Sequence, residues 1–153
     1  MPKRPIVAFE TDADGDWVAR LSCGHLQHVR HKPPFMVRDW VTTAQGRDGK
    51  IGTNLDCVRC DRFELPASFV AYKRTPEFDE TTVPAGLRRD HSTKVGVWAR
   101  IVVIHGRLRY CVDALNTDVE LSQDRTGVVV PGVLHHVEPV GAVRFYVEFY
   151  RAP

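Results

Sequence analysis

The stretch G-V-V-V-P-G-V-L-H-H-V-E-P-V-G-A-V-R-F-Y-V-E-F-Y, residues 127–150, decides the fold class of this chain. It consists of three apolar or alternating runs separated by proline and glycine: residues 128–130, 133–138 and 145–150. Side chains that alternate with period two between such breaks are typical of short antiparallel strands. The stretch therefore predicts three strands, with two adjacent histidines in the second one.

The same pattern extends backward to about residue 63. Further strands are expected over residues 69–74, 80–83, 95–105, 108–114 and 119–121, with a turn at the glycine between the third and the fourth. Seven or eight short strands with frequent turns predict a β-sandwich or a β-barrel, and no helix is expected after residue 62.

The first part of the chain has a different pattern. Two strands are expected over residues 6–10 and 17–22, and a short helix over residues 36–45 with Gly46 as its C-cap. No linker rich in proline, glycine or serine separates the two parts. We therefore expect a small α+β, zinc-binding-like domain over residues 1–62 and a mainly β domain over residues 63–153.

The charge balance argues against one class of function. The chain has 21 Lys and Arg against 19 Asp and Glu, a net charge of +2. Neither part has the basic excess of a nucleic-acid-binding protein, and no apolar run approaches the roughly 20 residues of a membrane span. We expect a cytoplasmic protein with neither nucleic acid nor membrane as a partner. Exposed strand edges also make a homodimer possible.

Three of the four cysteines have the spacing of metal ligands. A C-x-x-C pair ends the first domain, and C-G-H supplies a second close pair upstream. Structural zinc takes four sulfur or nitrogen ligands, usually as two such pairs. A segment of about 60 residues buries only a small core, so a bound metal would add stability that the core lacks. The predicted zinc ligands are Cys23, His25, Cys57 and Cys60, with His28 or His31 as alternates for the histidine.

Two other interpretations of the cysteines are open. They could be buried thiols, or Cys57 and Cys60 could form a redox pair. The redox pair is disfavoured because no helix N-terminus is expected after it to lower a thiol pKa. The remaining cysteine, Cys111, stands alone in a predicted strand and is expected in the core.

A second group of candidate ligands lies in the β domain. His91 precedes a long strand, His135 follows a Pro-Gly turn, and Glu148 lies in the last strand. This layout resembles the two motifs of the cupin barrel, although the second histidine and the glutamate of the standard first motif are missing. Such three-ligand sites suit zinc, iron, nickel or manganese. We expect a divalent metal here, with His136 as an alternate ligand.

Side chains near this second site are candidates for holding an anion or a small molecule. They are Arg88, Lys94, Arg100 and Tyr146. The alternative is that the arginines are surface charges, that each histidine is a satisfied core or surface group, and that Glu148 pairs with an arginine.

Two sets of segments carry a family resemblance. The C-terminal set comprises Y-K-R-T-P-E-F at 72–78, P-A-G-L at 84–87, D-H-S-T-K at 90–94, G-V-W at 96–98, G-R-L-R-Y at 106–110, and residues 143–151. Through these segments, residues 65–151 resemble the small cupin family found at the N-terminus of TehB-type tellurite-resistance methyltransferases and in YeaR-like proteins. Through residues 15–19, 21–25, 27–31, 33–34, 40–41 and 55–57, residues 6–61 resemble a domain of unknown function that occurs fused to this cupin.

The resemblance implies a C-terminal cupin-like barrel, a double-stranded β-helix, with His91 and His135 as its site histidines. It implies a role near tellurite, nitrite or oxidative stress, without methyl transfer. We therefore expect a small metal-binding cupin protein in the response to toxic oxyanions or to nitrosative or oxidative stress. The alternatives are a metal-dependent enzyme of the dioxygenase or isomerase type, and a metal-sensing or protein-interaction module without catalysis.

Overall fold

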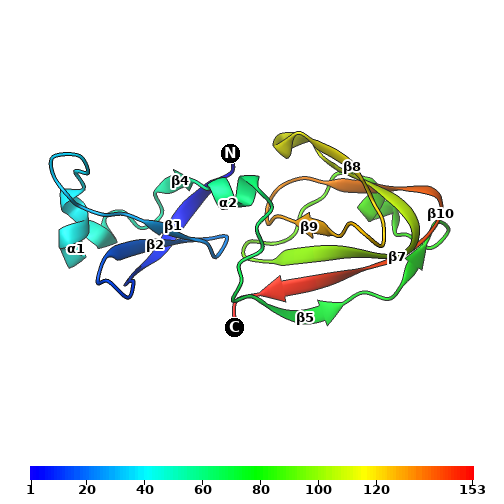
Figure 1. Cartoon of the computed structure of the whole chain (residues 1–153), viewed down its shortest axis with the longest axis horizontal. Coiled ribbons are helices and arrows are strands. Elements are labelled where there is room, and N and C mark those ends of the chain that lie inside the picture. The colour runs from blue at the N-terminus through cyan, green and yellow to red at the C-terminus, as the bar shows by residue number, and fades with distance from the viewer. The chain divides into compact units, whose positions relative to one another are not determined.

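The structure, a computed structural model, describes residues 1–153, and its contacts divide the chain into unit 1, Met1–Arg59, and unit 2, Cys60–Pro153. Both units consist mainly of β-strands (Figure 1), as the sequence predicts. The two α-helices are short, α1 (Ala44–Asp48) and α2 (Val58–Asp61), and the division falls within α2. None of the helices has the length and apolar surface that crossing a bilayer requires.

Unit 1 contains a four-stranded antiparallel sheet in the order β3-β2-β1-β4. Its strands are β1 (Lys3–Thr11), β2 (Trp17–Leu21), β3 (Leu26–His28) and β4 (Asn54–Asp56). The turn between β1 and β2 is held by the carboxylate of Asp12, which accepts hydrogen bonds from two backbone N–H groups of the same turn. The two strands predicted at the start of the chain are confirmed, with ends that differ by up to three residues.

The helix predicted over residues 36–45 is wrong in position. A 3-10 turn, η1 (Asp39–Thr42), occupies the middle of that range, and α1 begins after it. The hydroxyl of Thr43 caps α1 by accepting a hydrogen bond from the N–H of Gly46. Gly46 therefore lies inside α1 and not at a C-cap. A Cβ atom at this position would lie 2.1 Å from the carbonyl oxygen of Trp40, so the close approach of the two backbones requires glycine.

Unit 2 is built on two long antiparallel strands, β7 (Trp98–Val112) and β10 (His136–Arg151). The remaining strands each pair with one of these two. They are β5 (Val70–Arg74) and β6 (Phe78–Asp79) on β10, and β8 (Thr117–Leu121) and β9 (Gly127–Val129) on β7. The six-stranded sheet curls (Figure 1). Two 3-10 turns, η2 (Ala85–Arg88) and η3 (Asp113–Leu115), complete the unit, and no α-helix follows residue 62.

Two predicted pairs of strands are single strands in the structure. Most of the runs 95–105 and 108–114 merges into β7, and residues 136–138 of the run 133–138 join the run 145–150 in β10, whereas residues 133–135 precede that strand. The glycines bend these strands and do not reverse the chain: Gly106 takes a φ of 78°, opposite a register shift between Pro139 and Val143. The strand predicted over 80–83 is a turn that follows β6. A cupin-type double-stranded β-helix stays a prediction; the observed architecture is one curled antiparallel sheet.

The bend at Gly106 gives a stability prediction with an internal control. A Cβ atom there would lie 2.1 Å from the carbonyl oxygen of Ala142, whereas a Cβ atom at Gly141, which has a similar φ of 71°, would have no neighbour within 4 Å. We expect Gly141→Ala to lower the free energy of unfolding by about 1 kcal/mol, because of the left-handed backbone alone. Gly106→Ala should lower it by at least about 3 kcal/mol, because the steric clash adds to that cost. Urea unfolding followed by circular dichroism measures both, and equal losses would contradict the steric argument.

Candidate metal centre and ligand cavity

The first pair of predicted metal ligands lies on a tight turn between β2 and β3. The N–H of Leu21 donates to the carbonyl of His25 at 2.9 Å, and the N–H of Gly24 donates to the carbonyl of Leu21 at 2.8 Å. Gly24 has a φ of 93°, a value that glycine adopts without strain. Cys23 and His25 flank this glycine, and both are buried, with 1% and 3% of their surface exposed.

The second pair lies where β4 ends and α2 begins. Cys57 directly follows β4, and its N–H donates to the carbonyl of Pro2 at 2.9 Å. Cys60 lies in α2, and its carbonyl accepts a hydrogen bond from the N–H of Phe63. Both cysteines are buried, with 3% and 0% of their surface exposed. The two-residue spacing lets one short turn present both thiols.

Strand β1 brings the two pairs together. It pairs with β2 on one side, where Ile6 faces Leu21, and with β4 on the other side, where Lys3 faces Asp56. The last residues of β2 and β4 therefore lie beside the first half of β1, although the cysteines that follow them are 34 positions apart in the sequence. The sheet topology, and not local sequence, closes the site.

The resulting distances fit a tetrahedral metal ion. The Sγ atoms of Cys23 and Cys57 are 3.8 Å apart, and Nδ1 of His25 lies 3.4 Å and 3.2 Å from them. Together with Cys60, all four ligand atoms lie within 4.8 Å of one another. A tetrahedral zinc with Zn–S of about 2.3 Å and Zn–N of about 2.0 Å holds two sulfurs about 3.8 Å apart and a sulfur and a nitrogen about 3.5 Å apart. These four residues could therefore bind a metal such as zinc.

The alternate histidines are engaged elsewhere. Nε2 of His28 lies 2.9 Å from the carboxylate of Asp12. Nδ1 of His31 accepts a hydrogen bond from the N–H of Arg38 at 3.0 Å, and its Nε2 lies 3.1 Å from the carboxylate of Asp39. His25 is the histidine that the fold brings to the cysteines.

Of the two other predictions about the cysteines, the one for Cys111 agrees with the structure and the one about a helix beside the C-x-x-C pair does not. Cys111 is buried in β7, where its thiol donates to Asp118 at 3.4 Å and burial raises its pKa, in keeping with a core position. The expectation that no helix follows Cys57 is wrong, because α2 begins at the next residue. That helix is a single four-residue turn, and the tetrahedral spacing of the cluster is the observation that favours a metal over a redox pair.

Unit 2 encloses a separate cavity of about 590 Å³. Its walls are mainly apolar side chains of β7, β9 and β10 and of the segment from residue 84 to residue 97. The polar residues in the walls are Lys73, Thr75, His91, Ser92, Thr93, Lys94 and His135. A concave apolar site with a few polar groups has the character of a small-molecule binding site.

His91 and His135 lie side by side in the cavity wall. Their backbones form an isolated antiparallel bridge, and their ring centroids are 4.2 Å apart. Each Nδ1 is placed to donate to a backbone carbonyl, that of Arg89 at 2.9 Å and that of Val133 at 3.1 Å, which leaves each Nε2 with a lone pair. Burial lowers the pKa of His135 to about 4, so this ring is neutral at pH 7.

Glu148, the third predicted ligand of this site, is not brought to the two histidines. Val147 and Phe149 line the cavity, so Glu148 between them points to the opposite face of β10. On that face it accepts a hydrogen bond from the hydroxyl of Tyr150 and another from Arg74, and both lower the pKa of its carboxyl. The structure brings together two of the three predicted ligands. The third lies on the other face of its strand, because side chains alternate along β10.

Of the four predicted ligand-binding residues, Lys94 lines the cavity. Arg100 and Tyr146 lie on the outer face, where the guanidinium of Arg100 lies over the ring of Tyr150 at 5.2 Å and Tyr146 is covered by an arginine of β5 at 4.1 Å. Arg88 ends η2 and does not line the cavity, although the two residues before it do.

The alternate ligand His136 is also outside the cavity wall. Its Nδ1 lies 2.8 Å from the carboxylate of Asp90. Two wall residues that the sequence analysis does not single out as binding residues are Lys73 and Thr93. Both lie in segments that carry the family resemblance, 72–78 and 90–94, and that resemblance is the signal that could have identified them.

Two protein families match the chain, one after the other. Residues 7–64 match the family described as "Protein of unknown function (DUF3565)", and residues 73–147 match the family described as "TehB-like domain". The chain is also 27% identical over 100 residues to "Uncharacterized protein YeaR" of Escherichia coli strain K12, and equally to that of strain O157:H7. These alignments cover 59% of this chain and 84% of each relative.

Two solved structures share the fold of part of the chain. The crystal structure of TehB from Haemophilus influenzae has a TM-score of 0.52 at 22% identity, and the likeness covers 56% of this chain and 32% of TehB. A crystal structure of a protein from E. coli strain K12 has a TM-score of 0.54 at 26% identity, covering 57% of this chain and 95% of that one. This chain thus spans about a third of the length of TehB. Residues 7–64 are thus similar to the DUF3565 family, and residues 73–147 to the TehB-like family.

Proposed function

We propose that this is a small metal-binding protein in which zinc at Cys23, His25, Cys57 and Cys60 stabilises the DUF3565 segment, and in which the TehB-like domain binds a small molecule in its cavity. The observation that carries the zinc site is the set of four buried ligand atoms at tetrahedral spacing. Four protein ligands leave no coordination position for a substrate, so the role of this zinc is structural.

The small core of unit 1 supports a structural role. In its 59 residues the buried aliphatic side chains are few: Ile6, Val18, Ala19, Leu21, Val29 and Val41. A domain of this size is only marginally stabilised by its core. Zinc bound by cysteine and histidine contributes on the order of 10 kcal/mol to the folding of small domains. The metal would therefore be the largest single contribution to the stability of this unit.

The geometry of unit 2 favours binding over catalysis. A metal enzyme of the dioxygenase or isomerase type would need a third protein ligand and a group placed for proton transfer. Glu148, the predicted third ligand, and Tyr146, whose hydroxyl could transfer a proton, lie on the face of β10 opposite the cavity. The cavity instead offers two imidazole rings in a mainly apolar wall. A ligand that is held and released fits this arrangement.

The biological setting of the proposal rests on the families. The TehB-like match and the likeness to TehB favour a cytoplasmic role, with a cupin-type barrel, in the response to tellurite or another oxyanion, or to nitrosative or oxidative stress. Growth of a strain that lacks the gene, in the presence of tellurite and of nitrite, tests this setting. Unchanged growth under both would argue against it.

Elemental analysis of the purified protein tests the zinc site. We expect about one equivalent of zinc per chain in the wild type and less than about 0.2 equivalents in Cys57→Ser, because the loss of one of four ligands removes most of the affinity. Cys111→Ser is the matched control, since Cys111 is equally buried but bonded to Asp118 outside the cluster. A Cys57→Ser protein that keeps its full zinc content would refute the site.

The same measurement addresses the divalent metal predicted beside His91 and His135. A second metal that is lost in His135→Ala and kept in His136→Ala would support it, since His136 is bonded to Asp90 outside the cavity wall. If neither variant loses metal, the cavity carries no resident ion, and the metal-binding proposal is confined to the cysteine cluster.

Removal of the zinc should loosen the sheet of unit 1 and leave the sheet of unit 2 intact. We expect a high-affinity chelator to abolish the hydrogen-exchange protection of amides in β2 and β4, because the metal joins the ends of these strands. Amides of β7 and β10 should keep their protection. Amide exchange followed by NMR measures both sets, and equal loss in the two units would contradict a local structural role.

A further inference from the structure

The cavity of unit 2 has a large apolar wall. Its side chains include Phe78, Leu87, Ile101, Val129, Phe145 and Val147. A volume of about 590 Å³ lies in the middle of the range for drug-sized ligands, which bury most of their own surface in such sites. An inorganic oxyanion has no apolar surface to match this wall, and its desolvation there would be unfavourable. The apolar wall therefore favours an organic ligand.

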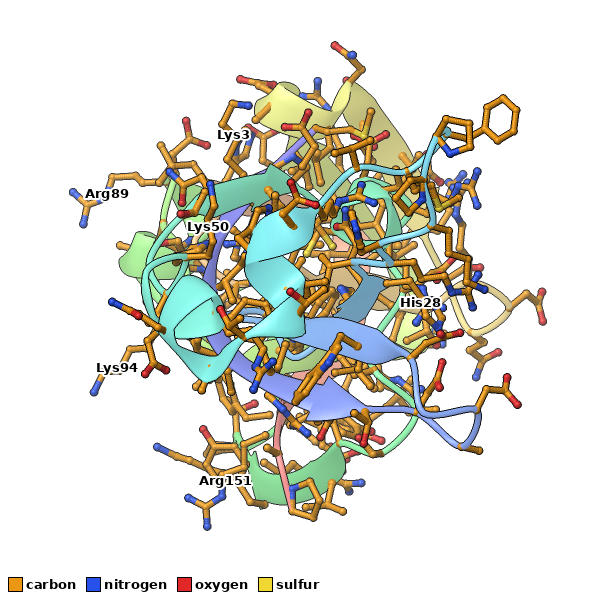
Figure 2. The ribbon with its side chains drawn as sticks, turned by 90° about the vertical axis from the view of Figure 1, so that its left-hand side faces the viewer. Lys3, His28, Lys50, Arg89, Lys94 and Arg151 are labelled. Atoms are coloured by element: carbon orange, nitrogen blue, oxygen red, sulfur yellow. The ribbon has the colours of Figure 1, made fainter.

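The polar side chains of the same cavity are either basic or neutral. They include two lysines, Lys73 and Lys94, and the two imidazoles, and no aspartate or glutamate is among the lining residues. Lys94 and Arg89, which lie on either side of His91 in the sequence, both extend from the ribbon into solvent (Figure 2), and Lys94 is the one of the two that lines the cavity.

Three carboxylates in or beside the segment around His91 and the cavity strands have other partners. Asp90 pairs with His136 at 2.8 Å, and Glu80 accepts a hydrogen bond from the N–H of Val143 at 3.1 Å. Glu148 pairs with Arg74 on the outer face of β10. No acidic side chain therefore offsets the positive field of the lysines within the cavity wall.

We propose that the cavity binds an amphipathic organic anion, a monocarboxylic acid whose apolar body lies against the aliphatic and aromatic wall. The carboxylate lies towards Lys94 and Lys73, and the imidazoles form the polar part of the wall that it contacts. This inference rests on the proposed small-molecule role of the cavity and names the class of ligand.

Three ligands with one chain and different heads test the charge preference. Octanoate, octanol and octylammonium carry an anionic, a neutral and a cationic head on the same apolar body. We expect octanoate to bind roughly fivefold more tightly than octanol, as one partly exposed ion pair provides, and octylammonium to bind more weakly than either. NMR titration of the zinc-loaded protein measures the three dissociation constants. The shifted amides of the wild type should be those of the cavity segments 72–78, 84–101 and 127–149.

Two further comparisons separate the contribution of the apolar chain to the binding affinity from the contribution of the charged head. Each methylene removed from octanoate should weaken binding roughly fourfold at most, because it loses the transfer of one CH₂ from water. The double variant Lys73→Met and Lys94→Met keeps the aliphatic stems and should weaken octanoate binding roughly fivefold while leaving octanol unchanged. Lys50→Met, a lysine of unit 1, is the control and should change neither.

The possible outcomes are distinguishable. If octanoate and octanol bind with equal affinity, or octylammonium binds most tightly, the inference of an organic anion is overturned while the cavity remains a binding site. Binding that shifts amides outside the cavity segments overturns it as well. If none of the three ligands binds at millimolar concentration, the small-molecule role proposed for the cavity fails with it.

Discussion

The pairing of β7 with β10 is the interaction on which unit 2 depends. The two strands are hydrogen-bonded from one end to the other, and each of the four shorter strands pairs with one of them. Alternate residues along parts of these two strands line the cavity, for example Ile101 on β7 and Val147 on β10. Because side chains alternate across a strand, this one pairing also decides which residues can reach a ligand and which face outward.

In unit 1 a single strand has the corresponding role. β1 lies between β2 and β4, and the ligand pairs follow the ends of those two strands. The hydrogen bonds of β1 position the cysteines, and a bound zinc would in turn fix the ends of β2 and β4. With zinc bound as proposed, sheet and metal site would be mutually dependent, and this would account for an ordered fold around few buried aliphatic side chains.

The features predicted well from sequence are those set by local spacing. Cys57 and Cys60 lie three positions apart and Cys23 and His25 two, so each pair is visible in the sequence before the fold is known. The choice of His25 over His28 was open, because it depends on the turn at Gly24 and on the competing carboxylate of Asp12.

The features predicted poorly depend on tertiary context. Glu148 was assigned to the cavity because aromatic residues alternate on both sides of it, and the sequence does not show that the Tyr146 side faces outward. The irregular register of β10 near residues 139–145 further obscures the parity. Likewise Gly106 marks a break in the pattern, and only the pairing partner decides whether the chain turns or bends there.

The metal centre proposed for unit 1 is tetrahedral, with three sulfurs and one imidazole nitrogen as ligands. X-ray absorption at the zinc K-edge tests it most directly on the purified protein. The account predicts a shell of three sulfur atoms at about 2.3 Å and one nitrogen at about 2.0 Å, with no open position. A first shell made mainly of oxygen and nitrogen, or one with fewer than three sulfurs, would contradict the account.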